Sequence, residues 1–216
     1  MSALKQMCRA LFSIRCLALL CVAFSLFAYG SCTYDSSAEQ NAEKLDFMDT
    51  ELDVIKKYIE VGKYKGLDVS VKNKSHDEAV WDAVEKNFEI KEWPISQLQY
   101  YRHQLESEYK YLAQKDGKSE SEIERLLEDS AGKILDEAKA LTKSDLVYSA
   151  IVKLEKISIS ADEKERLFDK YVEKYVSVYG YNTEYVKKNM ADEIYSSMLY
   201  DKTTEFLLTN NNIKEK

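Results

Sequence analysis

The chain has 216 residues, of which 45% are hydrophobic and 32% are charged, with only 1 proline and 6 glycines. So few turn-forming residues argue against a fold of many short strands, and a chain of this length supplies one ordinary core, so we expect an all-α protein. The net charge of −7, with Lys and Glu interleaved and no basic cluster, argues against a nucleic-acid partner.

The first 31 residues have the order of an export signal. Lys5, Arg9 and Arg15 make a basic start that contains no acidic residue. Residues 16–28 then form an apolar stretch that is too short to span a bilayer comfortably. We therefore predict that residues 1–31 are a signal peptide and that the mature protein lies outside the cytoplasm.

Small residues precede Cys32 as in a bacterial lipobox, although Tyr29 stands where that motif usually has an aliphatic residue. The order predicts a lipoprotein in which Cys32 carries the lipid and residues 32–41 are a flexible tether to the bacterial cell membrane. Two alternatives stay open: a secreted form cleaved after Gly30, and a form held by an uncleaved N-terminal segment.

All 4 cysteines lie within the first 32 residues. Beyond Cys32 the chain therefore has no thiol for a disulfide, a nucleophile or a metal ligand, and we expect no cofactor and no metal site. The 2 histidines, His76 and His103, stand on different predicted helices without a second ligand or a catalytic partner in motif spacing. We expect a protein that is not an enzyme.

Residues 42–216 are predicted as one helical domain, with a linker helix and an extended arm over 42–72 and a helical body over 75–216. Apolar residues at helical spacing indicate a helix from Leu45 to about Val61, and alternation over 63–71 indicates the extended arm. Further helices are predicted to begin at Ser75, Pro94, Ser119 and Ser160, and a polar tail follows the last helix at residues 210–216.

The longest predicted element runs over residues 119–156 and contains no proline. Its apolar residues keep helical spacing to Leu141, after which the stripe resumes from Val147 at a rotated angle. This phase shift predicts a bend or a helix–helix turn at residues 142–145. Such a helix is longer than a compact domain of this size is wide, so we expect an elongated body built from helical hairpins.

From about residue 88 to 213 several features follow in order: Trp93-Pro94 opening a helix, a Gly-Lys-Ser turn, the long helix, a break at residues 159–163, and an ending at residues 205–208 with Ile213. In this order of elements the chain resembles the C-terminal chaperone domain of trigger factor, which shares its outline with SurA-type export chaperones. The resemblance implies a fold of helical arms around a cradle that binds unfolded polypeptides.

Two parts of trigger factor have no counterpart here. No segment matches its ribosome-binding loop, so the resemblance implies no ribosome partner. Residues 64–69 are similar to the linker that leads into its prolyl-isomerase domain. However, the stretch of chain between this segment and the chaperone-like helices is too short to form that domain. We therefore expect no isomerase activity.

Aromatic residues recur on two predicted helices. Tyr171, Tyr175 and Tyr179 fall at helical spacing beside Phe168, and Tyr101, Leu105 and Tyr109 form a second stripe. Either stripe can be ordinary core packing, but with 16 tyrosines an elongated helical body lacks the interior to hide them all. These seven residues are our candidate peptide-binding residues.

Two functions fit these expectations. The first is an ATP-independent, membrane-anchored holdase that binds unfolded or exported polypeptides outside the cytoplasm. The alternative is a lipoprotein scaffold or adaptor that uses the same helical surface for one specific folded partner.

Overall fold

The computed structural model describes residues 46–215, and 70% of them lie in 7 helices joined by short strands. The expected all-α class is confirmed. The predicted signal peptide, Cys32 and the tether lie outside the described residues.

The N-terminal part of the described chain is α2 (Leu52–Tyr58), β1 (Ile59–Glu60) and β2 (Asp68–Ser70). The helix predicted from Leu45 to Val61 is therefore too long. A turn precedes α2, in which the Asp46 carboxylate accepts a bond of 2.8 Å from the Met48 N–H. After α2 the backbone turns extended, because Ile59 pairs with Ile90 of the antiparallel strand β3 (Glu89–Ile90).

The helices that follow are α3 (His76–Glu85), α4 (Ile95–Lys115) and α5 (Glu120–Glu155). We predicted a bend or a helix–helix turn at residues 142–145, and the turn is wrong, because α5 is continuous through them. The phase shift has another cause. Before Leu141 the helix packs on α4, and from Leu146 onward it packs on the elements of the N-terminal part and the last helix, which lie on a different side.

The C-terminal part is α6 (Ala161–Tyr179), α7 (Thr183–Asn189), α8 (Ala191–Thr209) and β4 (Asn212–Lys214). β4 pairs in parallel with β2, with Val69 opposite Ile213. The polar tail predicted at residues 210–216 thus contains a strand. The extended arm predicted at residues 63–71 contains β2, the strand with which β4 pairs.

Three helices begin at the predicted serine. At α3 and α6 the N-cap serine and the glutamate three residues later satisfy each other's backbone N–H groups, which forms a capping box. At α5 the Glu122 carboxylate accepts from both the N–H and the hydroxyl of Ser119. Gly180 ends α6 in the left-handed conformation, as a helix C-terminus prefers. Local sequence therefore fixes where these helices start and stop.

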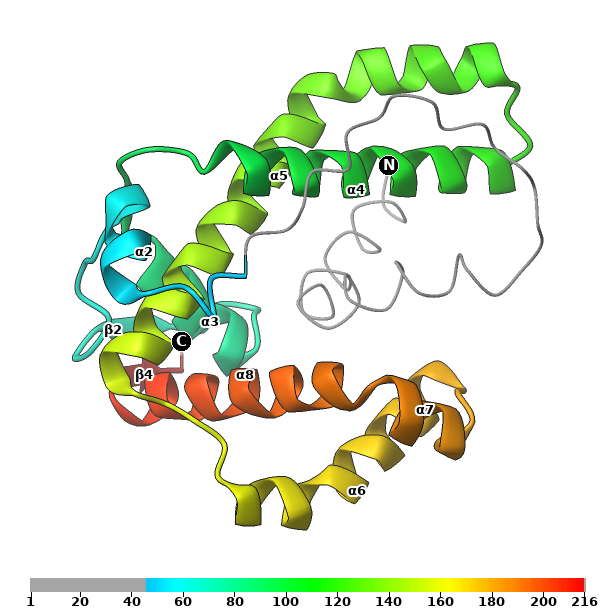
Figure 1. Cartoon of the computed structure of the whole chain (residues 1–216). Coiled ribbons are helices and arrows are strands. Elements are labelled where there is room, and N and C mark those ends of the chain that lie inside the picture. Colours follow the sequence, from blue (N-terminus) through cyan, green and yellow to red (C-terminus); the bar gives the residue numbers. More distant parts are fainter. Residues whose placement is uncertain (1–45, 216) are drawn as a thin grey trace.

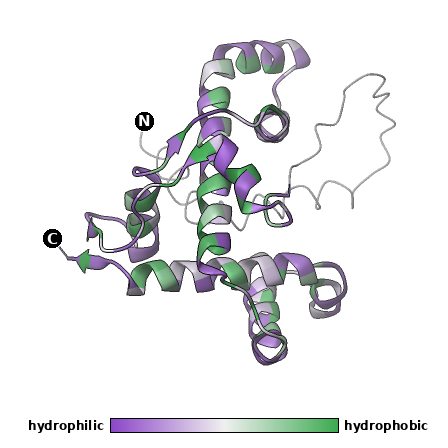
Figure 2. Cartoon of the chain, turned by 60° about the vertical axis from the view of Figure 1, so that its left-hand side comes forward, coloured by the Kyte–Doolittle hydropathy of each residue, from purple (hydrophilic) through white to green (hydrophobic). Residues whose placement is uncertain are grey.

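Three separate hydrophobic clusters divide the described chain into a body and two helical arms (Figure 1). The body comprises α2, α3, the four short strands, the C-terminal half of α5 and the end of α8. The first arm is α4 with the first part of α5, residues 95–141. The second arm is α6, α7 and the first part of α8, residues 161–198. The long helices carry both hydrophobic and hydrophilic residues (Figure 2). A helix of this kind can pack its apolar side on a neighbour and leave its polar side in water.

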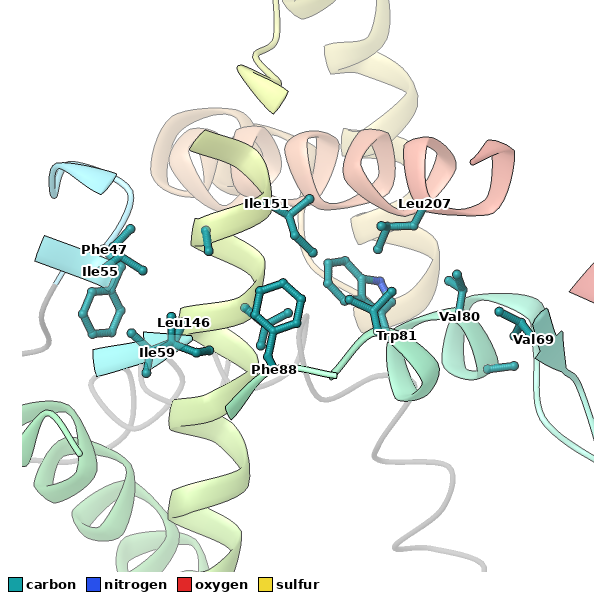
Figure 3. Packing of buried hydrophobic residues seen from close by; sticks show 14 residues of the cluster. Phe47, Ile55, Ile59, Val69, Val80, Trp81, Phe88, Leu146, Ile151 and Leu207 are labelled. Carbon is teal, nitrogen blue, oxygen red and sulfur yellow. The ribbon is translucent and has the colours of Figure 1, made fainter. Parts of the chain in front are cut away.

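The core of the body gathers side chains from both ends of the chain (Figure 3). Leu146 and Ile151 of α5 belong to one cluster with Phe88 and Trp81 from the α3 region and Leu207 of α8, and all five are buried. The segment at residues 46–71 belongs to the same core, since Phe47, Ile55, Ile59 and Val69 are buried in it.

Candidate peptide-binding surfaces

Tyr175 of α6 lies in the core of the second arm. Its ring is fully buried beside Val172 and Ile194, and its hydroxyl shares a hydrogen bond of 2.8 Å with the Ser197 hydroxyl on α8. In this structure the ring does not face a cleft, so the core alternative holds for Tyr175. The reason is that α6 packs on α8 along the face on which the tyrosine stripe lies.

Tyr171, one turn earlier, is half-buried at the same helix pair. Its hydroxyl donates a hydrogen bond of 2.7 Å to the Asp201 carboxylate. Burial, followed by that carboxylate, raises the pKa of the Tyr171 hydroxyl well above its usual value of 10.0. Tyr171 therefore joins α6 to α8 as a neutral donor at physiological pH. Tyr179 is the last residue of α6, and its side chain is outside what the structure describes.

Phe168 borders an open cavity of about 410 Å³ between α6 and α8. Its ring centroid lies 5.7 Å from that of Tyr195, and the Lys164 ammonium lies 4.4 Å from the Tyr195 ring centroid. The remaining lining residues are Ala161, Glu165 and Asp169. The cavity combines an aromatic floor with a charged rim, and it has room for an apolar side chain of a bound polypeptide.

The second predicted stripe lies inside the first arm. Tyr101 and Leu105 of α4 are buried against Ile134 and Ala138 of α5. Tyr109 is half-buried, and its hydroxyl accepts a bond of 2.7 Å from the Lys133 ammonium. These three side chains hold the hairpin together, so the stripe is an interior face and not an open surface.

The large apolar side chains that are exposed lie elsewhere on the arms. Among the described residues they are all on α4, α6 and α7: Ile95 at 61%, Tyr111 at 46%, Leu112 at 45%, Val178 at 60% and Tyr185 at 40%. Tyr185 also packs its ring 5.8 Å from that of Tyr181. Leu112 continues the helical spacing of Leu105 and Tyr109, but its side chain is 45% exposed near the end of the hairpin. Spacing alone gives no signal that separates it from Leu105.

The two histidines lie at separate places in the described part of the chain, each beside one glutamate. Both histidines are half-exposed, His76 at 2.8 Å from Glu215 and His103 at 3.6 Å from Glu106. Within residues 46–215, no group of three or more His, Cys, Asp or Glu side chains is arranged to hold a metal ion. None of the helices in that range is both long enough and apolar enough to cross a membrane.

Fold and surface together define an all-α protein with a small body and two helical arms, whose exposed apolar side chains lie on the arms. Comparisons with protein-family models, with curated proteins and with solved structures give no match.

Proposed function

We propose that this protein is an ATP-independent holdase that binds unfolded or exported polypeptides through its two helical arms. The observation that carries the proposal is the distribution of exposed apolar side chains. The described residues of the body leave no large hydrophobic side chain fully exposed, whereas α4, α6 and α7 leave five of them open to solvent. Exposed apolar residues that are confined to protruding elements are suited to contact with another chain.

Several weak contacts on two arms suit an unfolded ligand better than one tight pocket does. Each exposed tyrosine or aliphatic side chain buries only a modest area, but contacts on both arms raise the effective concentration of the same polypeptide at each site. Tyr111 and Tyr185 add rigid rings that keep a hydroxyl in contact with water when nothing is bound. The cavity beside Phe168 and Tyr195 adds a place for one larger apolar side chain.

The location and the remaining features of the proposal rest on the sequence. The basic, apolar and small-residue order before Cys32 supports an exported protein held at the membrane by a lipid. The likeness of residues 88–213 to the trigger factor chaperone domain supports the same type of activity, without a ribosome-binding or an isomerase domain. The shortness of the segment between β2 and α3, which is residues 71–75, supports the part of the proposal that leaves out an isomerase domain.

The proposal is tested by the suppression of aggregation in the absence of nucleotide. Three unrelated model proteins are unfolded chemically, diluted into buffer with the purified protein, and followed by light scattering. A holdase reduces the scattering of all three near stoichiometric ratios, and added ATP changes nothing. An unrelated acidic helical protein of similar size is the control.

The adaptor alternative gives a different outcome in the same experiment. A scaffold for one folded partner leaves the scattering of all three unfolded proteins unchanged. In a pull-down from the cell surface it also captures one stoichiometric partner, whereas a holdase captures many substoichiometric ones. That pair of results would replace the holdase proposal by the adaptor.

A further inference from the structure

The first arm meets the body through a small, partly buried polar group. The Gln97 side chain is fully buried, and its Nε2 donates a hydrogen bond of 2.8 Å to Oδ2 of Asp145 on α5. The Tyr101 hydroxyl donates to the same Asp145 oxygen. One carboxylate of α5 thus accepts two hydrogen bonds from successive turns of α4.

This polar group lies between two apolar clusters of α5. On one side is the arm cluster, which includes Ala138 and Leu141, and on the other is the body cluster, which begins at Leu146. The arm core and the body core are therefore not continuous along α5. A continuous core would hold the arm by close packing, whereas a polar layer holds it by a few directional hydrogen bonds.

A second feature lies at the same level of α5. One turn before Asp145, the Thr142 hydroxyl donates a hydrogen bond of 2.8 Å to the Ala138 carbonyl within the helix. A threonine that bonds back to the carbonyl four residues earlier slightly weakens and often bends a helix. The polar layer therefore coincides with a local weak point of the long helix.

We propose that Asp145, Gln97 and Tyr101 form a latch that fixes the angle of the first arm to the body, and that the arm swings about this level when the latch opens. Water can replace the lost hydrogen bonds of an opened polar layer, whereas opening an apolar core would expose surface or leave a cavity. The latch is a property of the empty protein. It does not depend on whether the arms bind unfolded polypeptides.

The test is a distance measurement between two spin labels in the full-length protein. Lys115, at the end of α4, and Lys86, after α3 in the body, are exposed and are changed to cysteine to carry the labels. The native cysteines, which all lie in the first 32 residues, are replaced by serine so that no other thiol reacts. Pulsed electron paramagnetic resonance then measures the distribution of distances between the label on the arm and the label on the body.

The latch variant is Tyr101→Phe, which removes only the hydroxyl and keeps the ring in the arm core. We expect a second population at a changed distance, enriched about tenfold over the parent, the size that follows from losing one hydrogen bond to a carboxylate. The matched control is Tyr109→Phe on the same helix, which removes the hydroxyl that contacts Lys133 farther from the body. It should leave the distribution unchanged.

Asp145→Asn is the second variant, and it keeps the shape of the acceptor while removing its charge. A circular dichroism melt of each variant confirms that the helices remain folded before the distances are compared. The latch is overturned by an unchanged distribution in folded Asp145→Asn and Tyr101→Phe, or by an equal change in Tyr109→Phe. If Tyr101→Phe does not fold, the Asp145→Asn distribution alone decides the matter.

Discussion

The indole Nε1 of Trp81 donates a hydrogen bond of 2.9 Å to the hydroxyl of Thr204, a residue 123 positions away in the sequence. The same indole stacks on the Tyr200 ring at a centroid distance of 5.5 Å and an interplanar angle of 14°. These two contacts join α3 to α8, so the body contains both the first helices and the last helix of the described chain. Folding of the body therefore requires both ends of the described chain.

Replacing the acceptor tests this connection. Thr204→Val keeps the shape of the buried side chain but leaves the Trp81 N–H without its partner, in a protein whose described residues have no other unsatisfied buried side-chain nitrogen or oxygen. We expect the free energy of unfolding to fall by about 1–3 kcal/mol. Urea unfolding followed by tryptophan fluorescence measures it. Thr209→Val, at an exposed position of the same helix, is the control and should change stability little.

Because Tyr175 is buried in the core of the second arm, we expect changes at this residue to lower the free energy of unfolding. Tyr175→Ser removes a fully buried ring and should lower the free energy of unfolding by about 3–5 kcal/mol. Tyr175→Phe keeps the ring and loses the hydroxyl that contacts Ser197 and the Glu193 carbonyl, so it should cost only about 0.5–1.5 kcal/mol. Chemical unfolding curves compare the two. Equal and small effects of both changes would mean that the ring is not packed in the arm core.

Local signals in the sequence predicted the helices well. The pairs Ser75 with Glu78 and Ser160 with Glu163 mark helix starts because a capping box depends only on residues within one turn. The long helix over residues 119–156 is likewise set by its own spacing and by the absence of proline. Such features need no knowledge of the tertiary structure.

Features that depend on distant partners could not be predicted. β4 pairs with β2, which lies 144 positions earlier in the sequence, and no local pattern marks Asn212–Lys214 as a strand. α2 is shorter than its periodicity suggests because Ile59 finds a strand partner in Ile90. The phase shift in α5 was visible, but its cause, a change of packing partner, is tertiary.

The candidate site shows the same limit. Spacing identified the stripes of α4 and α6 but could not tell an inner face from an outer one, since both carry apolar side chains. Tyr175, Tyr101 and Leu105 proved to be interior, whereas Tyr111 and Leu112 are exposed. Whether an apolar side chain of an amphipathic helix is buried depends on which face the partner helix covers and on how far that partner extends.

Glu163 should make stability depend on pH in the acidic range. Hydrogen bonds from the Lys202 ammonium at 2.7 and 2.9 Å, and one of 2.9 Å from the Ser160 N–H, lower the pKa of Glu163 from 4.5 to about 2. Because the folded state prefers the ionised carboxylate, its contribution is present above pH 4.5 and is lost as the pH falls from 4.5 towards 2.

The comparison of melting temperatures with Glu163→Gln checks this dependence. The parent should melt higher than the variant near neutral pH, and the difference should shrink as the pH is lowered through that window. Lys202→Met, which removes the main partner, should converge with the parent in the same range. A difference between parent and Glu163→Gln that stays constant from pH 6 to 3 would contradict the prediction.

The lipid anchor is tested at Cys32, which lies outside the described residues. A diacylglyceryl group supplies two acyl chains, enough for stable membrane attachment where one chain is marginal. Cys32→Ser should release the protein from the detergent phase or leave its precursor uncleaved, whereas Cys21→Ser, within the apolar stretch, should behave as the parent. Phase partition and the mass of the mature protein decide. Identical partition and mass of parent and Cys32→Ser would exclude the lipoprotein.

The central claim is that exposed apolar side chains on the arms capture unfolded polypeptides. The most direct test is a fourfold variant that changes Tyr111, Leu112, Val178 and Tyr185 to serine, compared with a control that changes the exposed Lys110 and Lys115 to serine. Because the four side chains are at least 40% exposed, the variant should unfold within a few degrees of the parent.

Suppression of aggregation of a chemically unfolded protein is then measured for the parent, the fourfold variant and the control at equal concentration. Our account predicts that the fourfold variant loses most of the suppression while the lysine control keeps it. Full suppression by a stably folded fourfold variant would contradict the account, because it would show that unfolded polypeptides bind elsewhere.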